Sequence, residues 1–166
     1  MPILQENSFE FISRSPEQTK RIGTRLGSQL YKGDVICLYG ELGAGKTTFV
    51  QGLVQGWGSS DMVTSPTFVL INQYHRPDGG EIHHLDAYRL RDEREAEVLD
   101  LDGLIDQGIL LVEWPERIEK ALPNENLLIE MYWIADEQRR MVFLPHGQRS
   151  VSLAEKLRQE IYREPV

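Results

Sequence analysis

The sequence predicts a three-layer α/β domain that spans residues 1–166 and contains a mixed β-sheet with added antiparallel hairpins. Three observations lead to this prediction. The apolar run DVICLYG leads directly into a glycine-rich loop, and an amphipathic segment follows the loop. Further apolar runs alternate with helix-like segments along the rest of the chain. Two pairs of strand-like runs are separated by short turn-forming sequences, which is typical of β-hairpins.

The first expected helix has a recognisable start. FEFIS, at residues 9–13, reads as a short strand, and SPEQ follows it closely. Ser15 is the expected N-cap, Pro16 fits the first helical position, and Gln18 lies three residues after the cap. Aliphatic residues then recur at four-residue spacing and give this helix one apolar stripe. The residues of the stripe are Ile22, Leu26 and Leu30.

A buried strand and a second helix flank the glycine-rich loop. DVICLY, at residues 34–39, is apolar enough for a buried strand. KTTFVQGLVQGW, at residues 46–57, continues from the loop as a helix whose apolar side chains share one side. Cys37 lies within the strand and is the only cysteine, so it cannot form a disulfide within the chain. We expect it to be a small buried side chain.

The middle of the chain predicts a hairpin followed by an acidic helix. SSDMVTSPT, at residues 59–67, has the composition of a loop, and FVLINQY, at residues 68–74, reads as a strand. RPDGG, at residues 76–80, is a turn, so EIHHLDAY, at residues 81–88, is expected to pair antiparallel with the strand before it. The acidic segment 91–106 is predicted to be helical.

The last third of the chain adds three strands and a helix. ILLVEW, at residues 109–114, is the clearest buried strand of the sequence. LLIEMYWI, at residues 127–134, and RRMVFL, at residues 139–144, are separated by ADEQ and predict a second hairpin. A helix over residues 151–162 is expected to close the chain.

Composition is typical of a globular protein, with 40% hydrophobic and 27% charged residues. No apolar run approaches the roughly 20 residues of a membrane helix, and the N-terminal segment does not resemble a signal peptide. We therefore expect a cytoplasmic protein. The net charge of −8 is unfavourable for a free-standing nucleic-acid binder, because such proteins gain affinity by neutralising phosphates. Any role on nucleic acid is expected to be indirect, through a partner.

The glycine-rich loop carries a phosphate-binding pattern, because Gly40, Gly45, Lys46 and Thr47 fit G-x-x-x-x-G-K-[ST]. The glycines let backbone N–H groups point at phosphates, and the following helix adds its positive dipole end. Lys46 would place a charge between the outer phosphates, and the Thr47 hydroxyl would coordinate Mg²⁺. The pattern predicts a nucleoside triphosphate site in a P-loop NTPase-like domain. The loop residues expected to bind the nucleotide are Gly40, Glu41, Leu42, Gly43, Ala44, Gly45, Lys46, Thr47 and Thr48.

Two carboxylates are candidates for the acidic group that Mg²⁺ and the attacking water need. Glu113 ends ILLVE, which is the Walker B pattern with glutamate in place of the more usual aspartate. Asp86 lies in a more polar strand, where Arg89 could instead pair with it. The sequence leaves open which carboxylate orients the water. His83 and His84 are not expected to form a transition-metal site, because adjacent strand residues point to opposite faces.

The segment TSPTF supplies another hydroxyl that could respond to a nucleotide. Pro66 biases Ser65 toward an extended conformation and stiffens the loop. Thr67 then stands just before a strand, where it could sense a γ-phosphate as threonines do in nucleotide switches. An ordinary strand start is the alternative interpretation of Thr67.

Four blocks taken together resemble a known family. GDVICLYGELGAGKTTFVQGL, TSPTFVLINQY, HHLDAYRL and LLVEWPERI follow the order found in bacterial TsaE (formerly YjeE) proteins, over residues 33–118. Those proteins are small ATPases required for threonylcarbamoyladenosine at position 37 of tRNAs that read ANN codons. The resemblance implies ATP and Mg²⁺ as cofactors. It also implies an accessory ATPase that acts on the TsaD–TsaB complex, which performs the carbamoyl transfer, with tRNA contacted only indirectly.

The resemblance also implies roles for individual residues. Thr67 would lie in a first switch-like segment, and Asp86 in a second one near the catalytic centre. Glu113 would act on the magnesium side, directly or through water, with Trp114 beside it as a second switch residue. The family holds the nucleotide base between the region before the first helix and the C-terminal hairpin. The corresponding base contacts are Ser15 and Arg139.

Two other functions would use the same loop. A small-molecule kinase would transfer the γ-phosphate to an acceptor, and such enzymes usually close an arginine-rich lid over the transferred group. The sequence shows no such segment, although Arg89, Arg91 and Arg94 keep this alternative open. A GTP-dependent binding switch is the second alternative. The sequence lacks the N-K-x-D motif that reads guanine, which argues against it.

Overall fold

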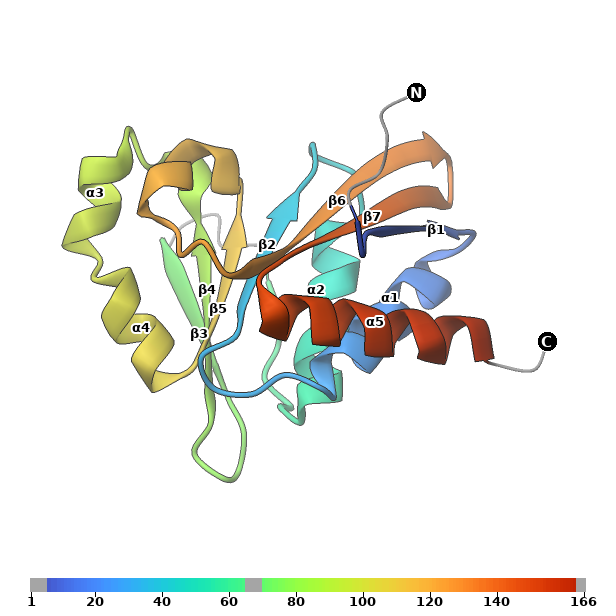
Figure 1. Cartoon of the computed structure of the whole chain (residues 1–166), viewed down its shortest axis with the longest axis horizontal. Coiled ribbons are helices and arrows are strands. Elements are labelled where there is room, and N and C mark those ends of the chain that lie inside the picture. The colour runs from blue at the N-terminus through green and yellow to red at the C-terminus, as the bar shows by residue number, and fades with distance from the viewer. Residues whose placement is uncertain (1–5, 65–69, 164–166) are drawn as a thin grey trace.

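The protein forms an α/β structure around a mixed β-sheet (Figure 1). The structure is a computed structural model that describes residues 6–64 and 70–163. Within these residues the sheet has seven strands in the order β1-β7-β6-β2-β5-β4-β3. The strands are β1 (Phe9–Ser13), β2 (Val35–Tyr39), β3 (Ile71–His75), β4 (Glu81–Asp86), β5 (Ile109–Glu113), β6 (Asn126–Ala135) and β7 (Gln138–His146).

The middle of the sheet is parallel and its two ends are antiparallel. β2 pairs in parallel with both β5 and β6, and β4 pairs in parallel with β5. β3 and β4 form one antiparallel hairpin, β6 and β7 form another, and β1 pairs antiparallel with β7. Both hairpins are those expected from the turn sequences. A mixed sheet with antiparallel additions confirms the predicted fold class.

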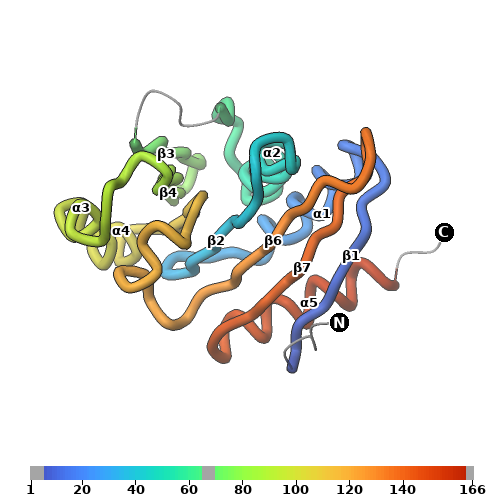
Figure 2. Tube along the Cα trace, turned by 90° about the horizontal axis from the view of Figure 1, so that it is seen from above, coloured from blue at the N-terminus to red at the C-terminus, as the bar shows by residue number. Residues whose placement is uncertain are grey.

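Helices cover both faces of this sheet. The helical segments are α1 (Pro16–Gly27), α2 (Lys46–Trp57), η1 (Ala87–Arg89), α3 (Glu93–Val98), α4 (Leu101–Gln107), η2 (Pro115–Ala121) and α5 (Gln148–Arg163). α1, α2 and α5 contribute to one buried core, and η1, α3, α4 and η2 contribute to a second. Figure 2 shows α3 and α4 grouped near β3 and β4, with α5 near β7 and β1 at the other end. The sheet is the middle layer of three.

The predicted start of α1 is confirmed. Ser15 is the N-cap, and its Oγ accepts a hydrogen bond from the Gln18 N–H at 3.1 Å. The Gln18 side chain accepts a second hydrogen bond from the Arg14 N–H at 2.7 Å. Pro16 lies in the first turn, where its missing N–H costs nothing. These contacts satisfy N–H groups that a helix start otherwise leaves without partners.

The acidic segment 91–106 differs from the prediction of one helix. It forms two short helices, α3 and α4, and Asp100 lies between them in the left-handed region at φ 54°. The Asp100 carboxylate accepts a hydrogen bond from the Gly103 N–H at 3.2 Å and caps α4. Aspartate tolerates the left-handed conformation and favours helix caps over helix interiors, which explains the break.

α1 and α2 cross with their backbones in direct contact. A Cβ at Gly27 would lie 2.0 Å from the Leu53 carbonyl oxygen, and a Cβ at Gly52 would lie 2.0 Å from the Lys20 carbonyl oxygen. Only glycine permits such an approach. Because α2 begins at the glycine-rich loop, this contact fixes where the loop stands relative to the core. Gly23 and Gly56 lie nearly as close to a carbonyl oxygen of the neighbouring helix, at 2.3 Å and 2.1 Å from their Cβ positions.

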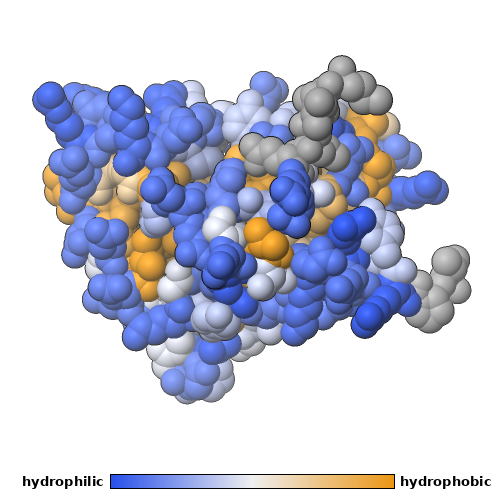
Figure 3. Space-filling view, in the orientation of Figure 1, coloured by the Kyte–Doolittle hydropathy of each residue, from blue (hydrophilic) through white to orange (hydrophobic). Residues whose placement is uncertain are grey.

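The surface is polar and the single cysteine is buried. Figure 3 shows a mostly hydrophilic face, on which apolar side chains form several small, separate groups. Among the described residues, no helix combines the length and the apolar character needed to cross a membrane. Cys37 is 2% exposed, as predicted, and burial raises the pKa of its thiol to about 12. The thiol therefore stays protonated at neutral pH.

Candidate functional site

The glycine-rich loop, residues 40–45, connects β2 to α2. Gly43 and Gly45 have φ values of 87° and 96°, in the left-handed region that favours glycine. A Cβ at Gly40 would lie 2.8 Å from the Met131 carbonyl oxygen, so the backbone needs glycine there too. Gly45 is the N-cap of α2 and has no side chain to cap it, which leaves the first N–H groups of α2 available to an anion.

The loop borders a cavity of about 820 Å³. Its walls come from the loop, the start of α2, the ends of β4 and β5, and β7. Among the lining residues that the structure describes, only Tyr88 is not one of the predicted site residues. The lining residues are Glu41, Leu42, Gly43, Gly45, Lys46, Thr47, Thr48, Asp86, Tyr88, Glu113, Trp114 and Arg139. The tertiary structure thus brings together residues that the sequence places far apart.

Within the described part of the chain, three predicted site residues do not line this cavity. Gly40 and Ala44 belong to the loop itself, where Ala44 is buried. Ser15 uses its hydroxyl to cap α1. Thr67 lies outside the described residues, so its expected role as a switch residue stays a prediction.

Lys46 lies at the floor of the cavity and is 9% exposed. Its ammonium group donates a hydrogen bond to the Gly40 carbonyl oxygen and lies 3.9 Å from Glu113 Oε1. The same nitrogen lies 4.4 Å from the centre of the Trp114 ring. Burial lowers the pKa of Lys46 below its usual value, while nearby carboxylates act in the opposite direction. A phosphate group is a chemically suitable replacement for these partners.

Glu113 and Asp86 end two neighbouring parallel strands and are paired in register. Glu113 is 7% exposed, and Asp86 is half-buried. Asp86 Oδ1 accepts a hydrogen bond from the Tyr88 N–H at 3.0 Å and caps η1. Both carboxylates thus lie at the C-terminal edge of the parallel strands, which is where open α/β sheets bind ligands.

The ionised form of Glu113 is favoured in this setting. Burial by itself would raise the pKa of Glu113, but the hydrogen bond from His84 and the charge of Lys46 outweigh burial. The pKa of Glu113 is therefore below its usual range, and the side chain is a carboxylate at neutral pH. A carboxylate can accept a proton or a hydrogen bond from water, or bind a metal ion.

His84 is a contact of Glu113 that sequence reasoning missed. His84 Nε2 lies 2.7 Å from Glu113 Oε2, and His84 Nδ1 lies 2.9 Å from the Tyr74 hydroxyl. Strand alternation places His84 on the same face as Asp86, which was the only available signal. His83, the next residue, has different partners. Its Nδ1 lies 3.4 Å from Gln73 Nε2.

Trp114 and Tyr88 form an aromatic wall of the cavity, with ring centres 5.1 Å apart. Trp114 has a φ of 58°, which is unusual for a bulky residue because its Cβ crowds the backbone. Backbone strain of this kind is found at functional sites when the surroundings enforce it. Trp114 follows Glu113 directly and precedes Pro115. The strained residue therefore connects β5, which ends in Glu113, to η2.

Arg139, from β7, lies against the loop. A Cβ at Gly45 would lie 3.6 Å from Arg139 Cγ. Arg139 Nη1 donates hydrogen bonds to the carbonyl oxygens of Ala135 and Gln138, both at 2.9 Å, within the β6–β7 turn. Its Nε is buried and has no hydrogen-bond partner in the described part of the chain. Arg139 thus hydrogen-bonds to the hairpin turn and also lines the loop cavity.

The groups around the loop are suited to a magnesium nucleotide. Mg²⁺ prefers oxygen ligands, and the cavity presents the Thr47 hydroxyl with the carboxylates of Asp86 and Glu113. The loop supplies backbone N–H groups, and Lys46 supplies a positive charge for phosphate oxygens. The donor set therefore fits both the metal ion and the phosphates that the sequence pattern implies.

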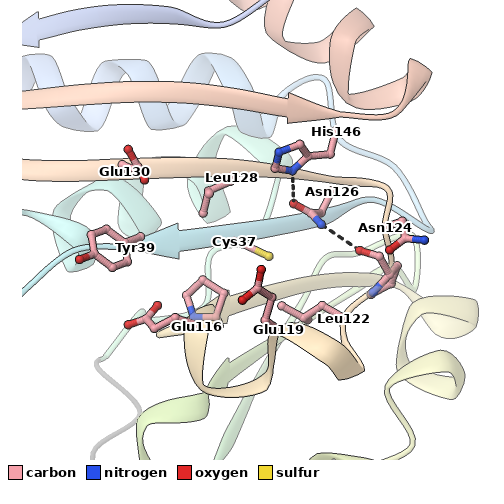
Figure 4. Close-up of a pocket in the computed structure, with 12 residues that line it drawn as sticks. Cys37, Tyr39, Glu116, Glu119, Leu122, Asn124, Asn126, Leu128, Glu130 and His146 are labelled. Atoms are coloured by element: carbon pink, nitrogen blue, oxygen red, sulfur yellow. Dashed lines mark hydrogen bonds between the residues drawn. The ribbon is translucent and has the colours of Figure 1, made fainter. Parts of the chain in front are cut away.

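A second cavity, of about 390 Å³, lies between η2 and strands β2 and β6 (Figure 4). Glu119, from η2, points toward Cys37 on β2 in this view. His146 Nδ1 and Asn126 Oδ1 lie 3.3 Å apart, and Asn126 also donates to the Pro123 carbonyl oxygen at 2.9 Å. None of the predicted site residues that the structure describes lines this cavity. The loop cavity is therefore the stronger functional candidate.

Comparisons with known proteins identify the family. The family described as "Threonylcarbamoyl adenosine biosynthesis protein TsaE" matches residues 13–141, which is more than half of the chain. This chain belongs to the TsaE family. The match includes the glycine-rich loop, both candidate carboxylates and Arg139, and it confirms the resemblance expected from the sequence.

Individual TsaE proteins resemble this chain over most of their length. The tRNA threonylcarbamoyladenosine biosynthesis protein TsaE of Bacillus subtilis (strain 168) is 42% identical over 144 residues, which are 86% of this chain and 89% of that protein. The protein of the same name from Treponema pallidum (strain Nichols) is 37% identical over 131 residues, or 78% and 96% of the two chains. The crystal structure of Bacillus subtilis YdiB matches with a TM-score of 0.77 and 34% identity, over 97% of this chain and 99% of that one.

Proposed function

We propose that this TsaE protein binds ATP with Mg²⁺ at the glycine-rich loop and hydrolyses it as an accessory step in the formation of threonylcarbamoyladenosine at position 37 of tRNA. The observation that carries this proposal is the convergence of Lys46 and Glu113. Their charged groups lie 3.9 Å apart at the start of α2 and the end of β5. The names of the relatives support the pathway, because they are called tRNA threonylcarbamoyladenosine biosynthesis proteins.

The loop and the start of α2 bind the triphosphate in this proposal. Backbone N–H groups hold the phosphate oxygens, and Lys46 contacts the outer phosphates in place of the Gly40 carbonyl. The Thr47 hydroxyl would hold Mg²⁺, and Glu113 would contact the ion directly or through water. When bound, Mg²⁺ supplies positive charge that stabilises the negative charge developing on the phosphate oxygens. Arg139 borders the cavity and is the better placed of the two proposed base contacts, the other being Ser15.

In this proposal, one of the two carboxylates, Glu113 or Asp86, orients the attacking water. Both carboxylates line the cavity and end adjacent strands, so a water molecule bound between them could face the γ-phosphate. Trp114 lines the same cavity, and its ring contacts the Lys46 ammonium group. A nucleotide that binds Lys46 would therefore also change the surroundings of Trp114. Thr67 is proposed to act from a switch-like segment, on the basis of the family resemblance.

The proposed partner is the TsaD–TsaB complex, with tRNA contacted through it. A net charge of −8 opposes direct binding to a polyanion over most of the surface. Hydrolysis would reset the partner complex between turnovers. The proposed setting is the cytoplasm, and the proposed unit is one domain over residues 1–166.

A small-molecule kinase remains the second candidate because it would use the same loop. The arginines that kept this alternative open in the sequence do not line the loop cavity. Arg91 is 90% exposed at its side chain and lies 3.8 Å from Glu95. Arg89 and Arg94 are exposed as well. The position of these arginines outside the cavity lining supports the accessory ATPase over the kinase.

ADP release separates the two candidates. The protein is incubated with ATP and Mg²⁺, first alone, then with the purified TsaD–TsaB complex, and finally with candidate small-molecule acceptors. We expect slow turnover alone and a changed rate with the complex. Turnover that requires a small-molecule acceptor would instead identify a kinase. Co-purification of the complex with and without ATP tests the partner directly.

A further inference from the structure

Three side chains from three adjacent strands form a buried chain that ends at the nucleotide cavity. Tyr74 on β3, His84 on β4 and Glu113 on β5 are 2%, 1% and 7% exposed. The Tyr74 hydroxyl lies 2.9 Å from His84 Nδ1, and His84 Nε2 lies 2.7 Å from Glu113 Oε2. The chain runs diagonally across the three strands, because each residue is two register positions away from the residue opposite the next one, and it ends next to Lys46.

The two oxygens of Glu113 have different neighbours. Oε2 is held by His84, whereas Oε1 lies 3.9 Å from the Lys46 ammonium group in the cavity. A glutamate side chain has several rotatable bonds, and ordering it costs conformational entropy. A hydrogen bond from a buried ring directly fixes which oxygen faces the ligand. Hydrogen-bond partners of metal ligands and of catalytic carboxylates orient those groups in the same way.

We propose that His84 is a positioning residue, oriented by Tyr74, that holds Glu113 Oε2 and thereby presents Oε1 to the nucleotide cavity. This inference rests on the proposed function of the cavity. His84 does not reach the cavity lining, so it acts through Glu113 rather than on the nucleotide.

The hydrogen positions follow from the two ends of the chain. Ionised Glu113 is only an acceptor, so His84 Nε2 must carry the hydrogen. Burial raises the pKa of Tyr74 to about 12, so its hydroxyl keeps its proton and can donate to His84 Nδ1. With Nε2 donating to Glu113, the Tyr74 hydroxyl is the group that meets His84 Nδ1, and this contact fixes the orientation of the ring.

The experiment compares three variants with wild type. His84→Leu removes both ring nitrogens, His84→Gln keeps an amide N–H that can reach Glu113, and Tyr74→Phe removes only the hydroxyl. For each, we measure kcat and KM for ATP hydrolysis, the Kd of a fluorescent ATP analogue with Mg²⁺, and thermal unfolding. We expect His84→Leu to lower kcat about tenfold or more, with the nucleotide Kd changed by less than about threefold. His84→Gln should recover part of the loss, and Tyr74→Phe should show a smaller loss in kcat.

His83→Leu is the matched control. His83 is also buried, lies one residue away on β4, and contacts Gln73 rather than Glu113. It should change stability without the selective loss in kcat. If His84→Leu does not fold, the test relies on Tyr74→Phe, because this variant removes only the hydroxyl group. A wild-type kcat in Tyr74→Phe would then overturn the proposal.

A second readout does not depend on hydrolysis. In nucleotide-free protein with ¹⁵N-labelled histidine, the NMR signal of His84, assigned by its absence in His84→Gln, should show a proton on Nε2. A signal without that proton would overturn the proposal. If wild type hydrolyses ATP and His84→Leu retains the wild-type kcat, the positioning role fails while the proposed function stands. If wild type neither binds nor hydrolyses nucleotide, the proposed function fails and this inference falls with it.

Discussion

The ammonium nitrogen of Lys46 lies 4.4 Å from the centre of the Trp114 ring. Lys46 belongs to the loop–helix motif, and Trp114 follows the strand that ends in Glu113, so this contact joins the two halves of the candidate site. A cation over an indole ring is a favourable contact, worth about 0.5–2 kcal/mol depending on exposure. A phosphate that draws Lys46 away would change the surroundings of the ring.

Trp114 should therefore report nucleotide binding by fluorescence. A variant that keeps only Trp114, with Trp57 and Trp133 changed to Phe, should show a saturable change in emission on titration with ATP and Mg²⁺. The control is Trp114→Phe with the other two tryptophans kept, which should respond much less. A flat titration in the first variant, with binding verified by calorimetry, would contradict this prediction.

Lys46→Ala should weaken ATP binding about tenfold or more, because hydrogen bonds to charged groups contribute about 1.5–3 kcal/mol. Isothermal titration calorimetry with ATP and Mg²⁺ measures the change. Lys32→Ala is the control, since Lys32 is exposed and does not line the loop cavity. Equal affinity in wild type and Lys46→Ala would exclude the proposed phosphate contact.

Glu113→Gln should lose hydrolysis far more than binding. The amide keeps the size of the side chain but cannot act as a base, and such groups contribute about 10²–10⁴-fold in rate. Single-turnover ADP formation and nucleotide Kd are compared with those of Asp86→Asn, which tests which carboxylate orients the water. A single-turnover rate like that of wild type would refute the role of Glu113.

The stability of the nucleotide-free protein should depend on pH through Glu113. The pKa of Glu113 is lowered in the folded state from the ordinary value of 4.5. Ionised Glu113 therefore stabilises the fold above that value, and the contribution disappears as pH falls through the lower folded pKa. Urea unfolding with a chelator present should show the free energy of unfolding falling more steeply below pH 4.5 in wild type than in Glu113→Gln. Equal slopes would mean that Glu113 is not stabilised as a carboxylate.

Gly52→Ala should destabilise the fold even though alanine is the better helix former. Its Cβ would lie 2.0 Å from the Lys20 carbonyl oxygen, and a backbone atom cannot move aside as a side chain can. We expect the free energy of unfolding to fall by about 1–3 kcal/mol. Gln51→Ala, at an exposed position of the same helix, should change it by less than about 0.5 kcal/mol. A Gly52→Ala variant as stable as wild type would show that α1 can move away from α2.

Local patterns predicted most of the fold. The strands around Cys37 and Leu111 are apolar enough to be recognised individually, and the start of α1 depends on Ser15 and Gln18, which are near neighbours. The break at Asp100 was not predicted, because an aspartate that caps a helix cannot be told apart in the sequence from the other acidic residues around it. The approach of Gly27 and Gly52 was missed because it depends on how two helices cross.

The candidate site also has parts that the sequence predicted and parts that it did not. The phosphate loop and the glutamate at the end of an apolar strand are visible in the sequence, because each depends on residues that are adjacent in the chain. The hydrogen bond from His84 to Glu113 joins residues 29 positions apart, and it exists because β4 lies beside β5 in the sheet. Arg139 borders Gly45 only because the β6–β7 hairpin folds over the loop.

By itself, the sequence determined the type of fold, the glycine-rich loop with its phosphate-binding pattern, and the two carboxylates that are candidates for work beside it. Only the tertiary structure decided that Tyr74, His84 and Glu113 form one buried chain and that Lys46 rests against Trp114. The physical reason is that periodicity and capping act between near neighbours in the chain. Contacts across the sheet depend instead on strand order and register, which no short stretch of sequence specifies.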